Sequence, residues 1–145
     1  CVSSGAAAEK FCTMVSEQGG PVSLLENAEN ILPAAPIVAP VKAMSAGYVQ
    51  AMHTKRIGNA VVSLGGGRLH PDDDIDPAVG LSRLVTTGDR IEEGEPLAFV
   101  HAGSEGDWLN AAQVVQNSVS IGEEPVPQSD VIHSRIDGTE NEYAG

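Results

Sequence analysis

The chain has few aromatic side chains and few cysteines. Only 3% of its 145 residues are Phe, Trp or Tyr, although 41% are hydrophobic, so the core must be built from aliphatic side chains. A chain of this length holds one domain with a modest core, with room for a terminal appendage. Its two cysteines, Cys1 and Cys12, have no metal-ligating neighbours and are too few for a disulfide framework, and Cys12 is expected to be a small packing residue.

Basic residues are also scarce, because 8 Lys and Arg stand against 20 Asp and Glu, for a formal net charge of −12. Proteins that bind nucleic acid need a basic surface to neutralise phosphates, so this composition argues against a nucleic-acid partner and against anionic membrane surfaces. No apolar run of about eighteen residues and no signal-peptide pattern occur. We therefore expect a soluble, cytoplasmic protein without a membrane partner. We also expect a piece of a longer protein, because the chain begins with Cys and enters a predicted helix almost at once.

Residues 3–18 are predicted to form a helix, because apolar residues recur on one face at spacings of three and four. These residues are Ala7, Ala8, Phe11, Met14 and Val15. The pair Gly19-Gly20 is expected to end the helix. A helix with one apolar stripe must pack on something, either the rest of this chain or another domain. The Pro-rich stretch 32–36 is the predicted domain boundary.

The region after this boundary reads as β-rich. Residues 37–43 are apolar and extended but contain Pro40, which favours an edge or bulged strand. Residues 48–52 alternate as a second strand, and the short turn between the two predicts a hairpin. A short helix is expected at 54–64, where apolar residues again lie on one face.

Further strands are predicted at 81–85, at 97–101 and at 118–121, and another is predicted to start at Arg90. The strand at Arg90 is expected to pair with the one at 81–85, across a turn. Gly88 and Gly94 are predicted to adopt positive φ in the turns between these strands. A helix is expected to start at Ser104, with a capping box in which Asp107 replaces the usual Glu. An apolar face is predicted to continue along it through Trp108, Leu109, Ala112, Val115 and Val119.

The run Gly65-Gly66-Gly67-Arg68 is the most conspicuous candidate for function. Three glycines suggest a phosphate cradle, but such loops precede a helix, where free N–H groups face the anion. These glycines follow a predicted helix, at its negative end, so a helix stop is the favoured interpretation. Arg68 suits either a backbone carbonyl or a ligand anion.

No other pattern supports a catalytic or metal site. Asp72, Asp74 and Asp76 have the spacing of calcium-loop ligands, but Pro77 stands where that loop requires glycine. The histidines share no metal spacing and have no local nucleophile, so each is expected to be a surface or capping residue. They are His53, His70, His101 and His133. We therefore predict no catalytic and no metal-ligating residues in this chain.

Several motifs nevertheless occur in a specific order and spacing between residues 5 and 122. They are Ala6-Ala-Ala-Glu-Lys-Phe-x-x-Met-Val15, Gly47-Tyr-Val, Ile57-Gly-Asn-Ala-Val-Val-x-Leu-Gly-Gly-Gly-Arg68, Ile75-Asp-x-x-Val-Gly80, Gly88-Asp89 and Pro96-Leu-Ala-x-x-His101. Together they resemble the C-terminal region of the pyrimidine nucleoside phosphorylase family, and its thymidine-specific branch is the most similar.

The resemblance implies an α+β domain of the α/β-hammerhead type, with helices packed on a small antiparallel or mixed sheet with barrel-sandwich-like hairpins. A helical segment, residues 1–32, would precede it and lead out of a catalytic domain that the chain lacks. Residues 33–122 would form the family's C-terminal domain, and 123–145 a polar, partly disordered tail.

The resemblance also implies a function. Such enzymes cleave thymidine with inorganic phosphate to thymine and 2-deoxyribose 1-phosphate, in pyrimidine salvage, as cytoplasmic homodimers. They need no cofactor, since phosphate is a co-substrate, and their N-terminal helical and phosphate-binding domains carry the catalytic residues. This chain alone is therefore expected to be inactive. The implied contribution of this chain is a mobile lid near the substrate, formed by Gly65, Gly66, Gly67, Arg68 and His70.

Two other classes stay open. One is a stand-alone interaction or regulatory module derived from this domain. The other is a biotinyl or lipoyl carrier, which would present a modified lysine at an exposed hairpin tip. Lys42 lies instead in a Pro-flanked strand and lacks a methionine on either side, so the carrier interpretation is the weaker of the two.

Overall fold

The computed structural model describes residues 3–126, and it confirms the predicted α+β class. Its elements, in chain order, are α1 (Ala6–Glu17), α2 (Ala28–Ile31), β1 (Ile37–Lys42), β2 (Gly47–Met52), α3 (Thr54–Val61), the wide helical turn η1 (Val62–Gly66), β3 (Gly80–Ser82), β4 (Arg90–Ile91), β5 (Pro96–Ala102), α4 (Glu105–Gln116) and β6 (Val119–Gly122). No helix in this part of the chain is long and apolar enough to cross a membrane.

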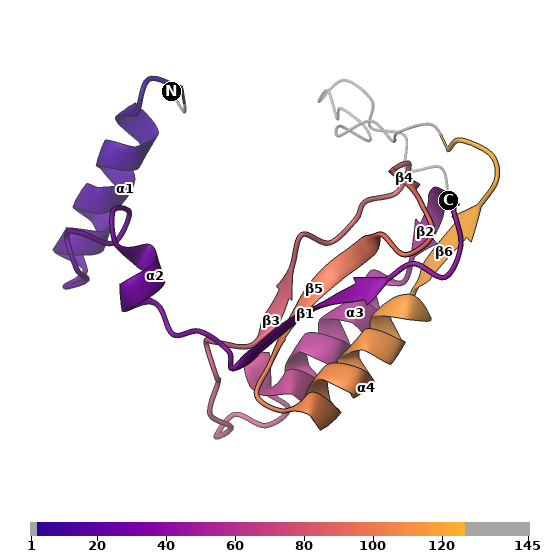
Figure 1. Cartoon of the computed structure of the whole chain (residues 1–145). Coiled ribbons are helices and arrows are strands. Elements are labelled where there is room, and N and C mark those ends of the chain that lie inside the picture. The colour runs from indigo at the N-terminus through magenta and orange to yellow at the C-terminus, as the bar shows by residue number, and fades with distance from the viewer. Residues whose placement is uncertain (1–2, 127–145) are drawn as a thin grey trace, which may run out of the picture.

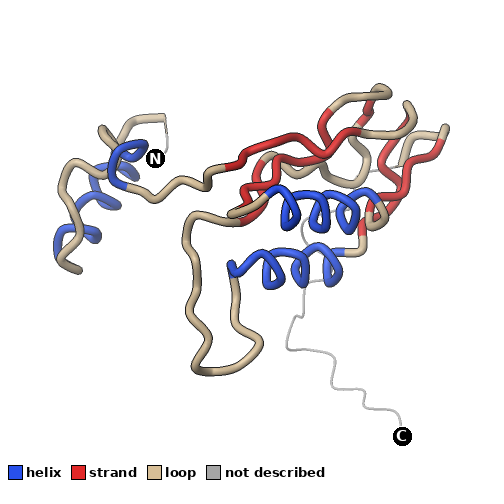
Figure 2. The backbone as a smooth tube through the Cα atoms, turned by 60° about the horizontal axis from the view of Figure 1, so that its bottom comes forward, coloured by secondary structure: helices blue, strands red, loops and turns tan. Residues whose placement is uncertain are grey.

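The strands form two small antiparallel sheets, ordered β1-β5-β3 and β4-β2-β6. Helices α3 and α4 lie on one side of the first sheet, as Figures 1 and 2 show, and α4 packs on β5 and β1. The predicted edge position of the proline-containing strand is confirmed, because β1 borders the sheet. α4 contacts this strand, where the Trp108 Nε1 donates to the Ala39 carbonyl at 3.2 Å.

The core is narrow and aliphatic, as the scarcity of aromatic residues requires. On β5, Ala98, Val100 and Ala102 are fully buried, and they face the helical layer. On α4 the buried residues are Ala111, Ala112 and Val115. Small side chains on both surfaces let the helix approach the sheet closely. The predicted apolar face of α4 was wrong at Leu109, which is exposed, and missed Ala111.

Positive-φ glycines occupy two of the turns that connect the strands. Gly88 has φ 94° and Gly94 has φ 85°, which confirms the prediction for both. The Gly94 N–H donates to the Ala43 carbonyl at 3.0 Å, and the Gly88 N–H donates to the Val49 carbonyl at 2.8 Å. The first bond continues the β1–β5 pairing beyond Lys42, and the second continues the β2–β4 pairing beyond Tyr48, so each turn extends one sheet next to the buried core residues Ala43 and Val49.

The predicted pairing of the strands was wrong in two places. β1 does not form a hairpin with β2; it pairs with β5, whereas β2 pairs with β4 and β6. The turn between β1 and β2 therefore carries the chain from one sheet to the other. The strand predicted at 81–85 ends at Ser82, because Arg83 turns to a positive φ of 50°, and β4 pairs with β2 instead of with this strand.

The N-terminal helix is present but uncovered. α1 spans most of the predicted range, and Gly19, with φ 81°, ends it as expected. None of its residues is buried, and Phe11 and Met14 are exposed. α1 and α2 stand apart from the sheets and from α3 and α4 in Figure 1. Residues 127–145, which hold His133 and most of the predicted tail, lie outside the described residues.

Ser104 is confirmed as the N-cap of α4, but the reciprocal bond of a capping box, from the Ser104 backbone N–H to the Asp107 carboxylate, is not among the contacts of the described residues. The Ser104 hydroxyl accepts the Asp107 N–H at 3.2 Å and donates to the Asp107 carboxylate at 2.6 Å. This fixes the start of α4, so that its small buried residues fall on the side that faces β5.

Two glycines with almost the same φ offer a matched test of this packing. Gly47 has φ 150° and Gly80 has φ 151°, so alanine at either position is strained by about 1–3 kcal/mol. A Cβ at Gly47 would also lie 2.5 Å from the Gly122 carbonyl oxygen, whereas a Cβ at Gly80 meets nothing within 4 Å. We expect Gly47→Ala to lower the free energy of unfolding by roughly 1–3 kcal/mol more than Gly80→Ala. Denaturant titration checks this, and equal losses would contradict the close approach of β2 to β6.

Candidate functional site

The glycine run ends the α3–η1 helix. Gly65 has φ 96°, a conformation that a glycine adopts without strain, and the helix stops there. Gly66 and Gly67 lack room for a side chain, because an added Cβ would lie 2.9 Å from Val61 Cγ1 or from Val62 Cγ2. The predicted helix stop is confirmed, and the helix's own geometry accounts for all three glycines without a bound phosphate.

The loop that follows is closed by its own hydrogen bonds. At its base, the Asp76 N–H donates to the Gly65 carbonyl at 2.9 Å. At its tip, Asp73 Oδ2 accepts the N–H groups of Leu69 at 2.9 Å and His70 at 2.8 Å. Arg68 Nε donates to the Asp73 carbonyl at 3.0 Å. Arg68 was expected to bind either a backbone carbonyl or a ligand anion. In the structure it binds a carbonyl, which belongs to the loop and not to the helix end.

The tip of the loop is exposed. Leu69 is 78% exposed, and the His70 side chain is 80% exposed although its Nδ1 lies 3.6 Å from the Asp73 carboxylate. Figure 2 shows the loop as a long tan segment that extends away from the helices and the sheets. The predicted lid residues thus lie together on one projecting loop. Their proximity to a substrate stays a prediction, because nothing in the described part of the chain tests it.

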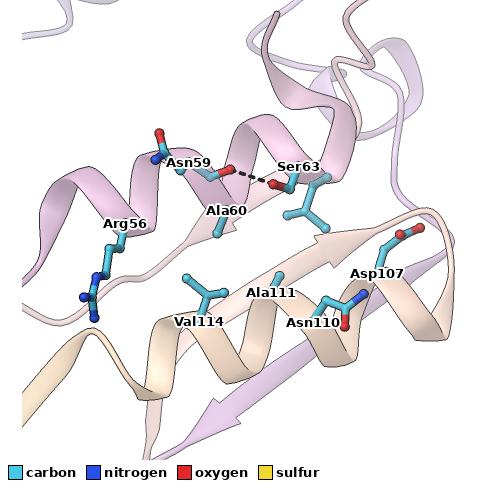
Figure 3. A pocket seen from close by; sticks show the side chains of 9 residues that line it. Arg56, Asn59, Ala60, Ser63, Asp107, Asn110, Ala111 and Val114 are labelled. Carbon is cyan, nitrogen blue, oxygen red and sulfur yellow. Dashed lines mark hydrogen bonds between the residues drawn. The ribbon is translucent and has the colours of Figure 1, made fainter. Parts of the chain in front are cut away.

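A separate hollow of about 470 Å³ lies between α3 and α4, as Figure 3 shows. Arg56, Asn59 and Ser63 of α3 and η1 line one side, and Asp107 and Asn110 of α4 line the other. The Ser63 hydroxyl donates to the Asn59 carbonyl at 3.0 Å, so it serves the helix and not an acid–base pair. None of the lid residues contributes to this hollow. It contains no nucleophile beside a base, so it offers binding surface without evident catalysis.

Sequence analysis missed one side-chain pair. The Ser82 hydroxyl lies 2.8 Å from His101 Nε2, across neighbouring strands β3 and β5. Among residues 3–126 no carboxylate contacts His101, so the pair lacks the third group that orients a catalytic histidine. Only the strand register brings the two residues together, and no local sequence signal contains that register.

The other candidates have structural explanations. Asp76 Oδ1 accepts the Ala78 N–H at 2.9 Å, which is the pattern of an ordinary turn. Within the described part of the chain no group of three or more His, Cys, Asp and Glu is arranged to hold a metal ion. Lys42 ends β1, where its carbonyl accepts Gln116 Nε2 at 2.9 Å, and does not lie at a hairpin tip.

The fold and the loop together define a small α+β domain that presents a projecting loop but, in its described residues, no catalytic constellation. Residues 48–122, from β2 to β6, match the model of the pyrimidine nucleoside phosphorylase C-terminal domain. The match covers just over half of the 145 residues and includes the glycine run and the loop. The chain belongs to this family.

Asp73 is predicted to hold the loop tip together. In Asp73→Ala, the Leu69 and His70 N–H groups lose a charged acceptor, which contributes about 1.5–3 kcal/mol per hydrogen bond. Their amide hydrogen exchange should therefore accelerate by about tenfold or more. Asp74→Ala is the control, because the Asp74 carboxylate accepts no hydrogen bond from the described residues. Equal exchange in both variants would show that Asp73 does not order the tip.

Proposed function

We propose that this chain is the C-terminal part of a thymidine phosphorylase, which converts thymidine and phosphate to thymine and 2-deoxyribose 1-phosphate in pyrimidine salvage. The observation that carries the proposal is the family match over residues 48–122. The specific order of the motifs that resemble the thymidine-selective branch supports the finer assignment. The enzyme is proposed to be a cytoplasmic homodimer that uses no cofactor.

The chemistry explains why this domain does not act alone. A phosphate oxygen forms a bond to C1′ while the bond from C1′ to the base nitrogen breaks, and the base leaves with the electron pair and then gains a proton. Such a step needs cationic groups for the phosphate and donors for the leaving base. The described residues contain no such cluster. We assign both tasks to the helical and phosphate-binding domains that precede this domain in the whole enzyme.

The loop 65–76 is proposed to be a lid over that active site. Water competes with phosphate for C1′, so excluding water favours phosphorolysis over hydrolysis. The lid needs a fixed base and a movable tip. The bond between Asp76 and Gly65 supplies the base, and the exposed residues around Leu69 supply the tip.

The function is tested on the reading frame that continues upstream of Cys1. The encoded protein should convert thymidine to thymine only when phosphate is present, and more efficiently than it converts uridine. The 145-residue chain, assayed in parallel by chromatography of the released base, should show no turnover. An upstream frame without a phosphate-binding domain, or an encoded protein without phosphorolysis, would refute the proposal.

The lid is tested by deleting residues 69–74 in the same protein. Turnover should fall by at least about tenfold, the KM for thymidine should rise, and the ratio of free 2-deoxyribose to 2-deoxyribose 1-phosphate should increase. Leu109→Ala on the exposed side of α4 is the control and should change none of these values. Unchanged turnover and thymidine affinity in the deletion variant would eliminate the lid.

A further inference from the structure

β1 is the longest border strand of the two sheets in the described part of the chain. It has six residues, whereas the other border strands, β3, β4 and β6, have three, two and four. A border strand presents backbone N–H and C=O groups without a partner, and these can pair with a strand of another chain. Because a long edge offers more such groups than a short one, β1 is the edge on which strand addition has to be prevented.

The hydrogen bonds of β5 show which residues of β1 face that neighbour. The Val85 N–H, on the β3 side, donates to the Leu97 carbonyl at 2.9 Å, so Leu97 faces β3. Successive residues of an antiparallel strand face opposite neighbours, so Ala98 faces β1, and its partner Val41 faces β5 in return. The register then skips Leu97 on β5 but no residue of β1, so the alternation along β1 is unbroken.

Val38, Pro40 and Lys42 therefore direct their backbone polar groups towards the free edge. The position of Ala43 agrees with this alternation, since its N–H donates to the Glu95 carbonyl at 2.8 Å and so faces the β5 side. Pro40 has no N–H, and its place in the alternation requires none for the pairing with β5. The proline thus removes a donor from the free edge without weakening the sheet.

A side chain of α4 occupies an acceptor at the same edge. α4 runs alongside β1 in Figure 1, and Gln116 Nε2 donates to the Lys42 carbonyl at 2.9 Å and lies 3.7 Å from Met44 Sδ. A mostly apolar hollow of about 680 Å³, whose lining includes Pro40 and Leu109, lies between the strand and the helix. An added strand could reach the edge there and place apolar side chains in the hollow.

We propose that Pro40 and Gln116 together close the free edge of β1 to strand addition, and that the strand they exclude is β1 of a second copy of this chain. Two antiparallel copies of one strand form a symmetric pair. Lys42 is the one charged residue of β1, and an antiparallel arrangement sends the two lysines to opposite ends, so no charge opposes the pairing. The proposal is independent of the proposed phosphorolysis.

Hydrogen exchange of the 145-residue chain tests the orientation of β1. The amides of Ala39 and Val41 face β5 and should exchange at least about tenfold more slowly than those of Val38 and Lys42, which face the free edge. The opposite order would place Pro40 on the side of β5 and overturn the proposal.

The double variant Pro40→Thr/Gln116→Met tests the closure. It restores a donor and frees an acceptor on each strand, and both changes count twice in a symmetric pair. The association constant between copies, measured by sedimentation velocity, should therefore rise by about tenfold or more over the unmodified chain. Gln113→Met is the matched control, because Gln113 lines the same hollow but its side chain forms no hydrogen bond with β1 in the described structure. An association constant unchanged in the double variant would refute the closure.

The site of association distinguishes strand pairing from contact through the hollow. As the concentration of the double variant rises, exchange of the Val38 and Lys42 amides should slow, whereas in Gln113→Met it should not change. Stronger association that leaves both amides unprotected would show a contact elsewhere and overturn the proposal. If circular dichroism shows that the double variant does not fold, Gln116→Met alone decides, with an expected rise of about threefold or more and the same protection. No rise in that variant would overturn the proposal equally.

Discussion

The contact between β5 and α4 is the interaction on which the rest of the structure depends. Small residues face each other there, and Val100 and Val115 are completely shielded from water. A chain with so few aromatic residues gains stability from close packing and not from large individual side chains. Because β5 also pairs with β1 and β3, a loss of this contact would remove the support of the whole first sheet.

The alternation along β5 gives one strand two tasks. Ala98, Val100 and Ala102 face the core, while Phe99 and His101 face outward. A shift of the register by one residue would bury His101 and expose Val100, so the strand cannot slip without losing the core. The same register places the Ser82 hydroxyl next to His101 Nε2, across the neighbouring strands β3 and β5.

Much of this could be predicted from the sequence, because periodicity and turn residues act locally. The helix stop at Gly65, the turns at Gly88 and Gly94 and the cap at Ser104 are each encoded within a few residues. Strand pairing is different. The turn after β1 is short enough for a hairpin, but the better apolar partner, β5, occurs much later in the chain. Local patterns contain no information on that choice, nor on the hydrogen bonds that Asp73 makes within the loop.

The glycine run shows how a conspicuous motif and its function can be separated. The side chains of Val61 and Val62 lie close to Gly66 and Gly67 and leave little room for a Cβ there, so the glycines alone do not indicate a ligand. What they provide is a sharp exit from a packed helix, with a hydrogen bond that holds the two ends of the loop together. A loop fixed in this way can move at its tip while its base stays in place. Under the proposed lid function, the described residues would influence catalysis only through where they hold this loop.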